Sequence, residues 1–338
     1  MKIRLNGHIF SSLAEVRNSI KGEVPDFLEE WLDEKSYVIG HTSGSTGEPK
    51  EIRLNKEDMR ASARITNEFL GIDSHSVLFI CLSVSYIAGK MMVVRALEAG
   101  AELFLGEVVS RPLRERPGMK IDLAAMVPMQ VEECLKYPEE KLVLAEIRQL
   151  LVGGAPVSPE LERGLKDIPT ACYATYGMTE TVSHVALRCM NEEENYFALG
   201  KVTFSTDKRG CLIIRTPHLL AGEFITNDLV ELIDERHFKW LGRYDNVINS
   251  GGVKFFPEMI EAKIAACISR RYFITARPDK RLGQRIVLVL EGKPQEEVEK
   301  MQLFHELRLR LTPYEMPKEI LYLPYFFETT SGKMIRRL

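Results

Sequence analysis

The sequence predicts an α/β protein with a large N-terminal α/β domain, an added antiparallel β section and a small α+β C-terminal domain. Apolar, β-rich runs alternate with helical patterns through most of the chain, which is typical of βαβ units around a mostly parallel sheet. Between about residues 201 and 240 the pattern changes to short strands with turns. A third pattern of helices and strands follows to the end of the chain.

The first pattern predicts the elements of the N-terminal domain. Its candidate strands are short apolar runs, namely Tyr37–Gly40, Val77–Leu82, Ala101–Leu105, Gln149–Val152 and Ala171–Tyr173. Its candidate helices carry apolar residues at helical spacing, namely Lys56–Leu70, Ala88–Glu98, Val131–Lys136 and Pro159–Lys166.

The second and third patterns predict the remaining elements. Gly210–Arg215 and Val230–Ile233 are expected to be strands of the antiparallel section. The C-terminal region predicts helices over Glu258–Ala266 and Glu296–Leu311, and strands over Tyr272–Ala276, Ile286–Glu291 and Glu319–Leu323. We therefore expect one domain over residues 1–242 and a second over residues 243–338.

The composition excludes several classes of protein. The 338 residues are 45% hydrophobic and 28% charged, which is near the globular average and unlike collagen, coiled coils or disordered chains. A net charge of −3 gives no electrostatic footprint for nucleic acid. No apolar run approaches the roughly 18 residues that a membrane span needs, and the polar start predicts no secretory signal. We expect a cytoplasmic protein.

The six cysteines are scattered and form no CxxC pair. Disulfide frameworks and zinc sites need clustered cysteines, so buried free thiols are the expectation.

A run rich in glycine and hydroxyl groups follows the first predicted strand. It contains Thr42, Ser43, Gly44, Ser45, Thr46, Gly47 and Lys50. Glycine lets the backbone approach a ligand closely, while the hydroxyls, exposed amides and the lysine charge suit a polyphosphate. A flexible Ser/Gly turn is the alternative.

This run resembles a motif of the adenylate-forming enzymes, a family that includes acyl-CoA synthetases, peptide-synthetase adenylation domains and luciferases. Other stretches resemble motifs of that family in the required order, namely Gly153–Pro156, Tyr173–Glu180, Thr226–Asp228, Gly242–Asp245, Gly251–Glu261 and Thr330–Arg336. The chain departs from the family in three ways. The hydroxyl-rich run begins unusually early, so we expect much of the usual N-terminal subdomain to be missing. In addition, Asn227 replaces a glycine, and His41 replaces an aromatic residue.

The resemblance implies that the enzyme joins a carboxylate to AMP from ATP and then transfers the acyl group to the thiol of coenzyme A. It implies catalytic roles for Lys333, Thr179 and Glu180, with Glu180 also binding Mg²⁺. It implies nucleotide and phosphate binding by the hydroxyl-rich run together with Gly154, Ala155, Tyr176, Gly177, Asp228 and Arg243. It also implies a mobile C-terminal domain that rotates about Asp245 and presents Gly251 and Gly252 to coenzyme A.

The acid is expected to be a small aromatic acid with a second carboxylate, bound near Tyr86, Lys90 and Ser183. Lys90 lies one helical turn from Tyr86 and is the candidate partner of the second carboxylate, although an ordinary surface lysine is an equal alternative. The expected partners are this carboxylic acid, ATP and coenzyme A, and a homodimer stays open. Two other functions also stay open, namely loading a carrier-protein thiol and silent nucleotide binding.

Overall fold

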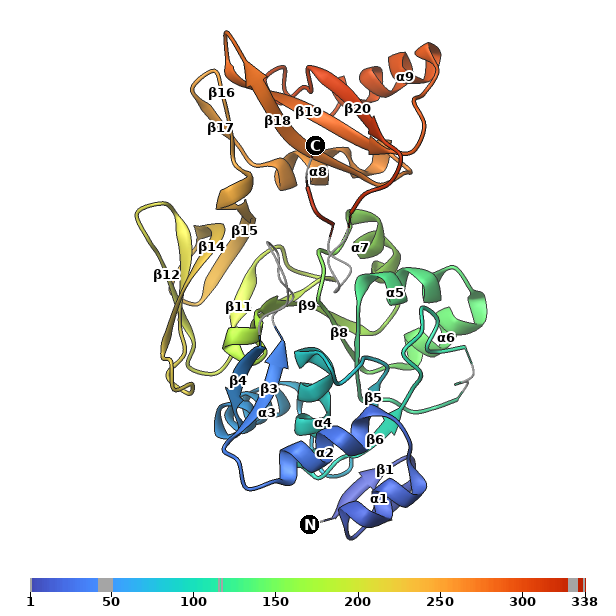
Figure 1. Cartoon of the computed structure of the whole chain (residues 1–338). Coiled ribbons are helices and arrows are strands. Elements are labelled where there is room, and N and C mark those ends of the chain that lie inside the picture. The colour runs from blue at the N-terminus through green and yellow to red at the C-terminus, as the bar shows by residue number, and fades with distance from the viewer. Residues whose placement is uncertain (1, 42–50, 115, 117, 328–333, 337) are drawn as a thin grey trace. The chain divides into compact units, whose positions relative to one another are not determined.

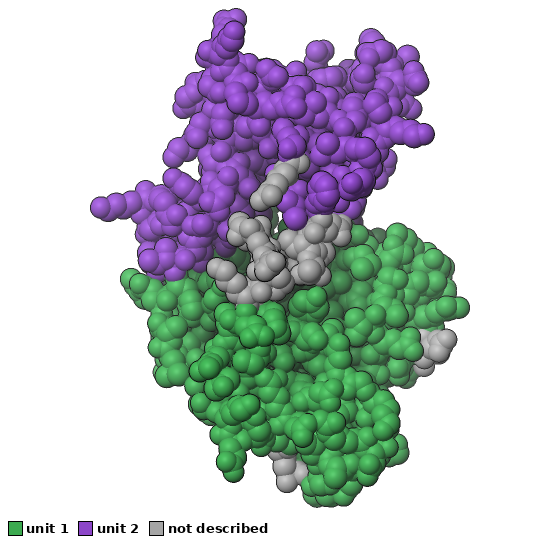
Figure 2. Space-filling model, viewed as in Figure 1, with its two compact units in different colours: residues 1–157, 161–204, 214–224 green, residues 158–160, 205–213, 225–338 purple. Residues whose placement is uncertain are grey.

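The structure is a computed structural model that describes residues 2–41, 51–114, 116, 118–327, 334–336 and 338. The chain forms two compact units, which Figure 2 shows in green and purple. The first comprises residues 1–157, 161–204 and 214–224, and the second comprises residues 158–160, 205–213 and 225–338. The expected domain boundary between residues 242 and 243 stays a prediction.

The first unit is built on a twisted sheet in which the strand order is β11-β10-β9-β8-β7-β5-β6-β1-β2. The strands are β1 Ile3–Leu5, β2 His8–Phe10, β5 Val77–Ile80, β6 Glu102–Leu105, β7 Leu123–Met126, β8 Gln149–Val152, β9 Ala171–Gly177, β10 His184–Cys189 and β11 Tyr196–Ala198. Strands β5 to β9 pair in parallel, whereas β10 is antiparallel to β9 and β11. The predicted α/β class is confirmed.

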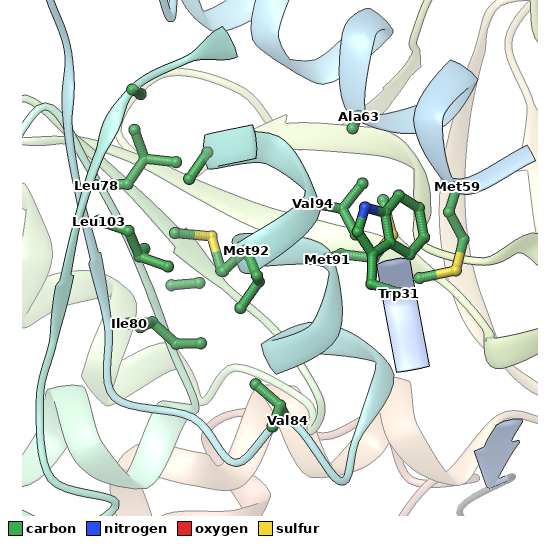
Figure 3. Packing of buried hydrophobic residues seen from close by; sticks show 14 of the residues in the cluster. Trp31, Met59, Ala63, Leu78, Ile80, Val84, Met91, Met92, Val94 and Leu103 are labelled. Carbon is green, nitrogen blue, oxygen red and sulfur yellow. The ribbon is translucent and has the colours of Figure 1, made fainter. Parts of the chain in front are cut away.

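Helices cover both faces of this sheet (Figure 1). They are α1 Leu13–Ser19, α2 Glu23–Leu32, α3 Lys56–Leu70, α4 Ile87–Ala99, α5 Pro128–Leu135, α6 Pro138–Glu146 and α7 Pro159–Lys166. Along β5, Leu78 packs with α2 to α4, while Phe79 packs in the cluster of α5 to α7. Figure 3 shows the first cluster, in which Met91 and Met92 of α4 lie among side chains of the strands and α3. Burial on both faces explains why these strands read as continuous apolar runs.

Several elements differ from the sequence expectation, and β3 and β7 are two of them. Strand β3 Tyr37–His41 does not join the parallel sheet in the described structure, but pairs antiparallel with β4 Glu51–Asn55. Strand β7 has the sequence Leu-Ala-Ala-Met and escaped prediction because it contains no β-branched or aromatic residue.

The antiparallel section, whose residues are divided between the two units, and the small C-terminal α+β part of the second unit were both expected. In the section the strands lie in the order β12 Thr203–Thr206, β13 Cys211–Arg215, β14 Glu223–Leu232 and β15 His237–Arg243. The C-terminal part contains β16 Ile248–Ser250, β17 Val253–Phe255, α8 Pro257–Ile264, β18 Tyr272–Asp279, β19 Gly283–Glu291, α9 Glu297–Arg308 and β20 Glu319–Leu323. Helices α8 and α9 cover one face of the β18–β20 strands, where Ile274 and Leu288 meet Ile260 and Leu307.

The cysteines are free thiols, as expected, although Cys189 and Cys267 are only partly buried. Among the described residues, no three His, Cys, Asp or Glu side chains gather in a way that could hold a metal ion. No helix in the described part of the chain is long and apolar enough to cross a membrane.

Candidate active site

Several predicted site residues follow directly after parallel strands of the first unit. Gly154 and Ala155 follow β8, and Tyr176 and Gly177 end β9. Since β8 and β9 are parallel, their carboxyl ends meet at one edge of the sheet, where α/β proteins commonly bind ligands. Gly177 is required by packing, because a Cβ there would lie 2.3 Å from the carbonyl oxygen of Ser183.

A tight turn after β9 carries Thr179 and Glu180. It is a 3-10 turn over Thr179–Thr181, and the buried hydroxyl of Thr181 accepts from the backbone N–H of Met178 at 3.0 Å and donates to the carbonyl of Ser183 at 2.7 Å. The next residue, Val182, has φ of 54°, which is a strained conformation for a β-branched side chain. The turn is thus held rigidly, and it leaves the Glu180 carboxylate exposed, with no ion pair to another described residue.

Strand β3 ends beside this turn. A Cβ on Gly40 would lie 3.5 Å from the methyl group of Thr179, and His41 pairs with Glu51 at the base of the β3–β4 hairpin. The structure therefore places Gly40 close to Thr179, and it pairs His41 with Glu51, the described residues on either side of the hydroxyl-rich run in the sequence. The predicted phosphate-binding residues Thr42, Ser43, Gly44, Ser45, Thr46, Gly47 and Lys50 lie outside the described residues, as does Lys333.

Ser183, a predicted substrate residue, contacts an arginine that the sequence reasoning missed. Arg95 lies on α4, is 2% exposed and donates from Nη2 to the Ser183 hydroxyl at 2.6 Å. Its Nε has no hydrogen-bond partner, and no carboxylate pairs with it in the described structure. Burial lowers the pKa of Arg95 to about 9, so the group keeps its charge at neutral pH. An unpaired buried cation costs stability, and the unfilled donor of Arg95 is available to an anionic group.

The residues around Arg95 are polar but carry no negative charge. Asn67 donates to the Arg95 carbonyl at 2.9 Å, and its own Oδ1 is buried without a partner. The Thr66 hydroxyl donates to Ser62 and so accepts from Nε2 of His184 at 3.0 Å, which assigns the tautomer. Burial and the charge of Arg95 hold the pKa of His184 well below its usual value, so the imidazole is neutral. Arg95 is therefore the cation of this cluster.

Lys90, the predicted partner of the substrate's second carboxylate, is engaged elsewhere. Its Nζ lies 3.3 Å from Glu30 and 4.5 Å from the ring centre of Phe27, and the residue is 6% exposed. Glu30 also accepts from the backbone N–H of Ile39 at 2.6 Å. Lys90 thus ties α4 to α2, and the alternative of an ordinary surface lysine is wrong because the side chain is buried. Tyr86 caps α4 and is 43% exposed.

In the second unit the structure brings together the predicted ribose and hinge residues. Arg243 lies 3.4 Å from Asp228 and 3.6 Å from Asp245. Asn227, which replaces the family's glycine, donates to Asp245 at 3.3 Å. Gly251 and Gly252 form the turn between β16 and β17, with φ of 60° and 82°, and nothing lies within 4 Å of a Cβ on Gly252.

The C-terminal tail is anchored within the second unit. Arg336 donates from Nη1 and Nη2 to the two carboxylate oxygens of Glu261 at 2.6 and 2.7 Å. Burial alone would lower the pKa of Arg336, but the carboxylate of Glu261 raises it above the usual value. This bidentate pair holds the chain three residues after Lys333.

Comparisons with known proteins agree with the sequence motifs. The profile of the family described as AMP-binding enzyme matches residues 10–209. The 2-succinylbenzoate–CoA ligase of Enterococcus faecalis is 25% identical over 335 residues, which cover 88% of this chain and 68% of that protein. The corresponding ligase of Bacillus cereus is 24% identical, with 96% of this chain and 74% of that protein covered.

Solved structures support the same assignment. An acyl-CoA synthetase (AMP-forming)/AMP-acid ligase II-like protein from Dyadobacter fermentans is 38% identical with a TM-score of 0.64, and the match covers 95% of this chain and 93% of that one. A second solved structure is the o-succinylbenzoate CoA synthetase of Bacillus subtilis in complex with its acyl-adenylate intermediate. It is 20% identical with a TM-score of 0.77, and the match covers 96% of this chain and 75% of that one. At this identity the match shows the shared fold. With a family profile over more than half of its length and a relative at this level of identity, the chain belongs to the family of AMP-binding enzymes.

Proposed function

We propose that this AMP-binding enzyme is an acid–CoA ligase that acts on o-succinylbenzoate, the substrate of the menaquinone pathway. The chain would form the acyl-adenylate from the acid and ATP and then transfer the acyl group to coenzyme A. The single observation that carries the choice of acid is Arg95, a buried guanidinium with no carboxylate partner in the described structure and one hydrogen bond to Ser183.

The chemistry of the acid fits this cation. o-Succinylbenzoate carries one carboxylate that is activated and a second, on the ring, that must be bound without reacting. A second carboxylate that reached Ser183 would meet the Nη2 side of Arg95 and the unfilled donor capacity of its Nε. Such charge-assisted hydrogen bonds are roughly twice as strong as neutral ones. Lys90 is less suited to the role, since Glu30 already balances its charge.

Adenylation needs groups that offset negative charge where the carboxylate approaches the α-phosphate. Thr179 would donate to that phosphate, and the hydroxyl-rich run would bind the β- and γ-phosphates. The exposed carboxylate of Glu180, which forms no ion pair with another described residue, fits Mg²⁺, which takes one or two carboxylates together with substrate phosphates. When bound, Mg²⁺ would supply charge neutralisation on the phosphates. Asp228 and Arg243 would bind the ribose hydroxyls, and Tyr176 would face the adenine.

The second half-reaction would use other residues of the second unit. Lys333 would act only in adenylation, when the carboxylate of the acid attacks the α-phosphate. The open turn at Gly251 and Gly252 would let the backbone approach the coenzyme A thiol, with Asp245 as the hinge between the two arrangements.

A pyrophosphate-release assay tests the proposal, with ATP, Mg²⁺ and a panel of carboxylic acids, each with and without coenzyme A. We expect o-succinylbenzoate to give the highest kcat/KM and coenzyme A to yield the thioester. A preference for a medium-chain fatty acid would contradict the choice of acid. Adenylate formation without thioester would favour a carrier-protein acceptor, and no pyrophosphate with any acid would favour a silent nucleotide-binding protein.

A further inference from the structure

Trp240 contacts the candidate ribose-binding carboxylate, although no sequence motif includes it. Its indole Nε1 donates to Oδ1 of Asp228 at 3.3 Å, and Nη1 of Arg243 donates to the same oxygen at 3.4 Å. All three residues lie on the paired strands β14 and β15 of the second unit. The side chain of Asp228 is 16% exposed, so these donors act on a carboxylate that is largely removed from water.

A β-bulge brings Trp240 to this position. Asp228 lies opposite Arg243 and Leu229 opposite Gly242, but the register then shifts, so that Val230 lies opposite Trp240 instead of Leu241. In a regular ladder Trp240 would point to the other face of the sheet from Asp228, because side chains alternate along a strand. The extra residue places Trp240 on the same face as Asp228 and Val230.

We propose that Trp240 is a positioning residue for nucleotide binding, which holds the Asp228 carboxylate in the orientation that accepts the two ribose hydroxyls. The proposal rests on the proposed role of Asp228. An indole N–H only donates hydrogen bonds. It can therefore orient a carboxylate without competing for the hydrogen bonds that the ribose hydroxyls donate. Two donors on Oδ1 fix the rotation of the carboxylate, and the ribose hydroxyls then meet an acceptor whose orientation is already set.

The chain offers a direct readout of this contact. It contains two tryptophans, and the other, Trp31, is 3% exposed in the core of the first unit. In a Trp31→Phe background, Trp240 is the single indole fluorophore. Binding of a ribose hydroxyl to Asp228 changes the environment of the indole N–H, so ATP should shift the emission of Trp240.

The test compares ATP with 2′,3′-dideoxy-ATP, which lacks both ribose hydroxyls. Trp240→Phe keeps an aromatic side chain but removes the N–H donor. We expect calorimetry to give a Kd for ATP about tenfold weaker than in the unchanged protein, since a hydrogen bond to a charged group is lost. The Kd for the dideoxy nucleotide should stay within about twofold, because that ligand does not use the carboxylate. Trp31→Phe is the control and should change neither Kd.

Equal weakening for both nucleotides would mean that Trp240 only supports the local fold, and it would overturn the proposal. An unchanged Kd for ATP would also overturn it. In an Asp228→Asn background, Trp240→Phe should cause no further loss, and an additive loss would contradict the inference. If the unchanged protein bound neither nucleotide, the proposed function itself would fail. The other outcomes test the role of Trp240 and leave the proposed function intact.

Discussion

Two arginines, one in each unit, are removed from water in opposite ways. Arg95 is 2% exposed, donates to the Ser183 hydroxyl and to the sulfur of Met92, and has a pKa lowered to about 9 by burial. The side chain of Arg336 is 22% exposed, forms a bidentate pair with Glu261, and has a raised pKa. A buried charge without a counter-ion lowers the free energy of unfolding of the protein. A buried charge within an ion pair lowers it only when the partner is removed. Arg336 thus holds the tail through an ion pair, whereas Arg95 has no carboxylate partner in the described structure and, under the proposed function, would receive the second carboxylate of the acid.

The largest expected effects concern stability and have opposite signs. Arg336→Met leaves the buried carboxylate of Glu261 unpaired and should lower the free energy of unfolding by about 3 kcal/mol. Arg95→Met removes an uncompensated charge and should raise the free energy of unfolding by about 1 kcal/mol. Urea titrations followed by circular dichroism measure both variants. A lower free energy of unfolding for Arg95→Met than for the unchanged protein would mean that Arg95 has a structural partner.

The second prediction tests whether the anchored tail serves one half-reaction. Lys333→Ala should slow adenylation at least about a hundredfold, or about 2.7 kcal/mol of transition-state stabilisation, because in the proposed function the lysine charge would act where carboxylate and phosphate meet. The same variant should convert supplied acyl-adenylate and coenzyme A at nearly the original rate. Gly252→Leu should show the reverse, since its side chain would obstruct the thiol and strain a backbone with φ of 82°. Pyrophosphate release and thioester absorbance measure the two steps. Equal slowing of both steps by Lys333→Ala would favour a single fixed active site.

The smallest expected effect concerns Lys90. Because Glu30 already balances its charge, Lys90→Met should change the preference for o-succinylbenzoate over a monocarboxylate by less than about threefold. It should instead destabilise the first unit, since it leaves Glu30 without its partner. Steady-state kinetics with both acids and a thermal melt check the two statements. A tenfold loss confined to the dicarboxylate would restore Lys90 as the substrate's partner.

The contrast between Lys90 and Arg95 also marks how far the sequence could predict the site. Glu180, Asp228 and Arg243 stand in local motifs, so their neighbours in the chain identify them. Lys90 and Arg95 lie five residues apart on one helix, and their roles depend on Glu30 and Ser183, which lie 60 and 88 positions away. The sequence offered one sign that Arg95 is buried, which is that it is the charged residue within the apolar run Met91–Ala96.

The fold shows the same limit. Alternating strands and helices predicted the sheet, because burial on both faces gives each strand a continuous apolar run. The pairing of β3 with β4, instead of with the large sheet, depends on contacts that no local pattern contains. The bulge in β15 that turns Trp240 toward Asp228 is likewise a property of strand pairing and not of the residues in either strand alone.

The claim that Arg95 receives the second carboxylate is tested most directly by the acid preference of Arg95→Met. The two acids are o-succinylbenzoate and 4-oxo-4-phenylbutyrate, which lacks the ring carboxylate. We expect kcat/KM for o-succinylbenzoate to fall at least about thirtyfold, since truncating one partner of a buried charge pair costs about 2 kcal/mol or more. The value for the monocarboxylate should stay within about threefold, and Arg95→Lys should recover part of the preference. Equal losses for both acids in a stably folded Arg95→Met variant would contradict the account.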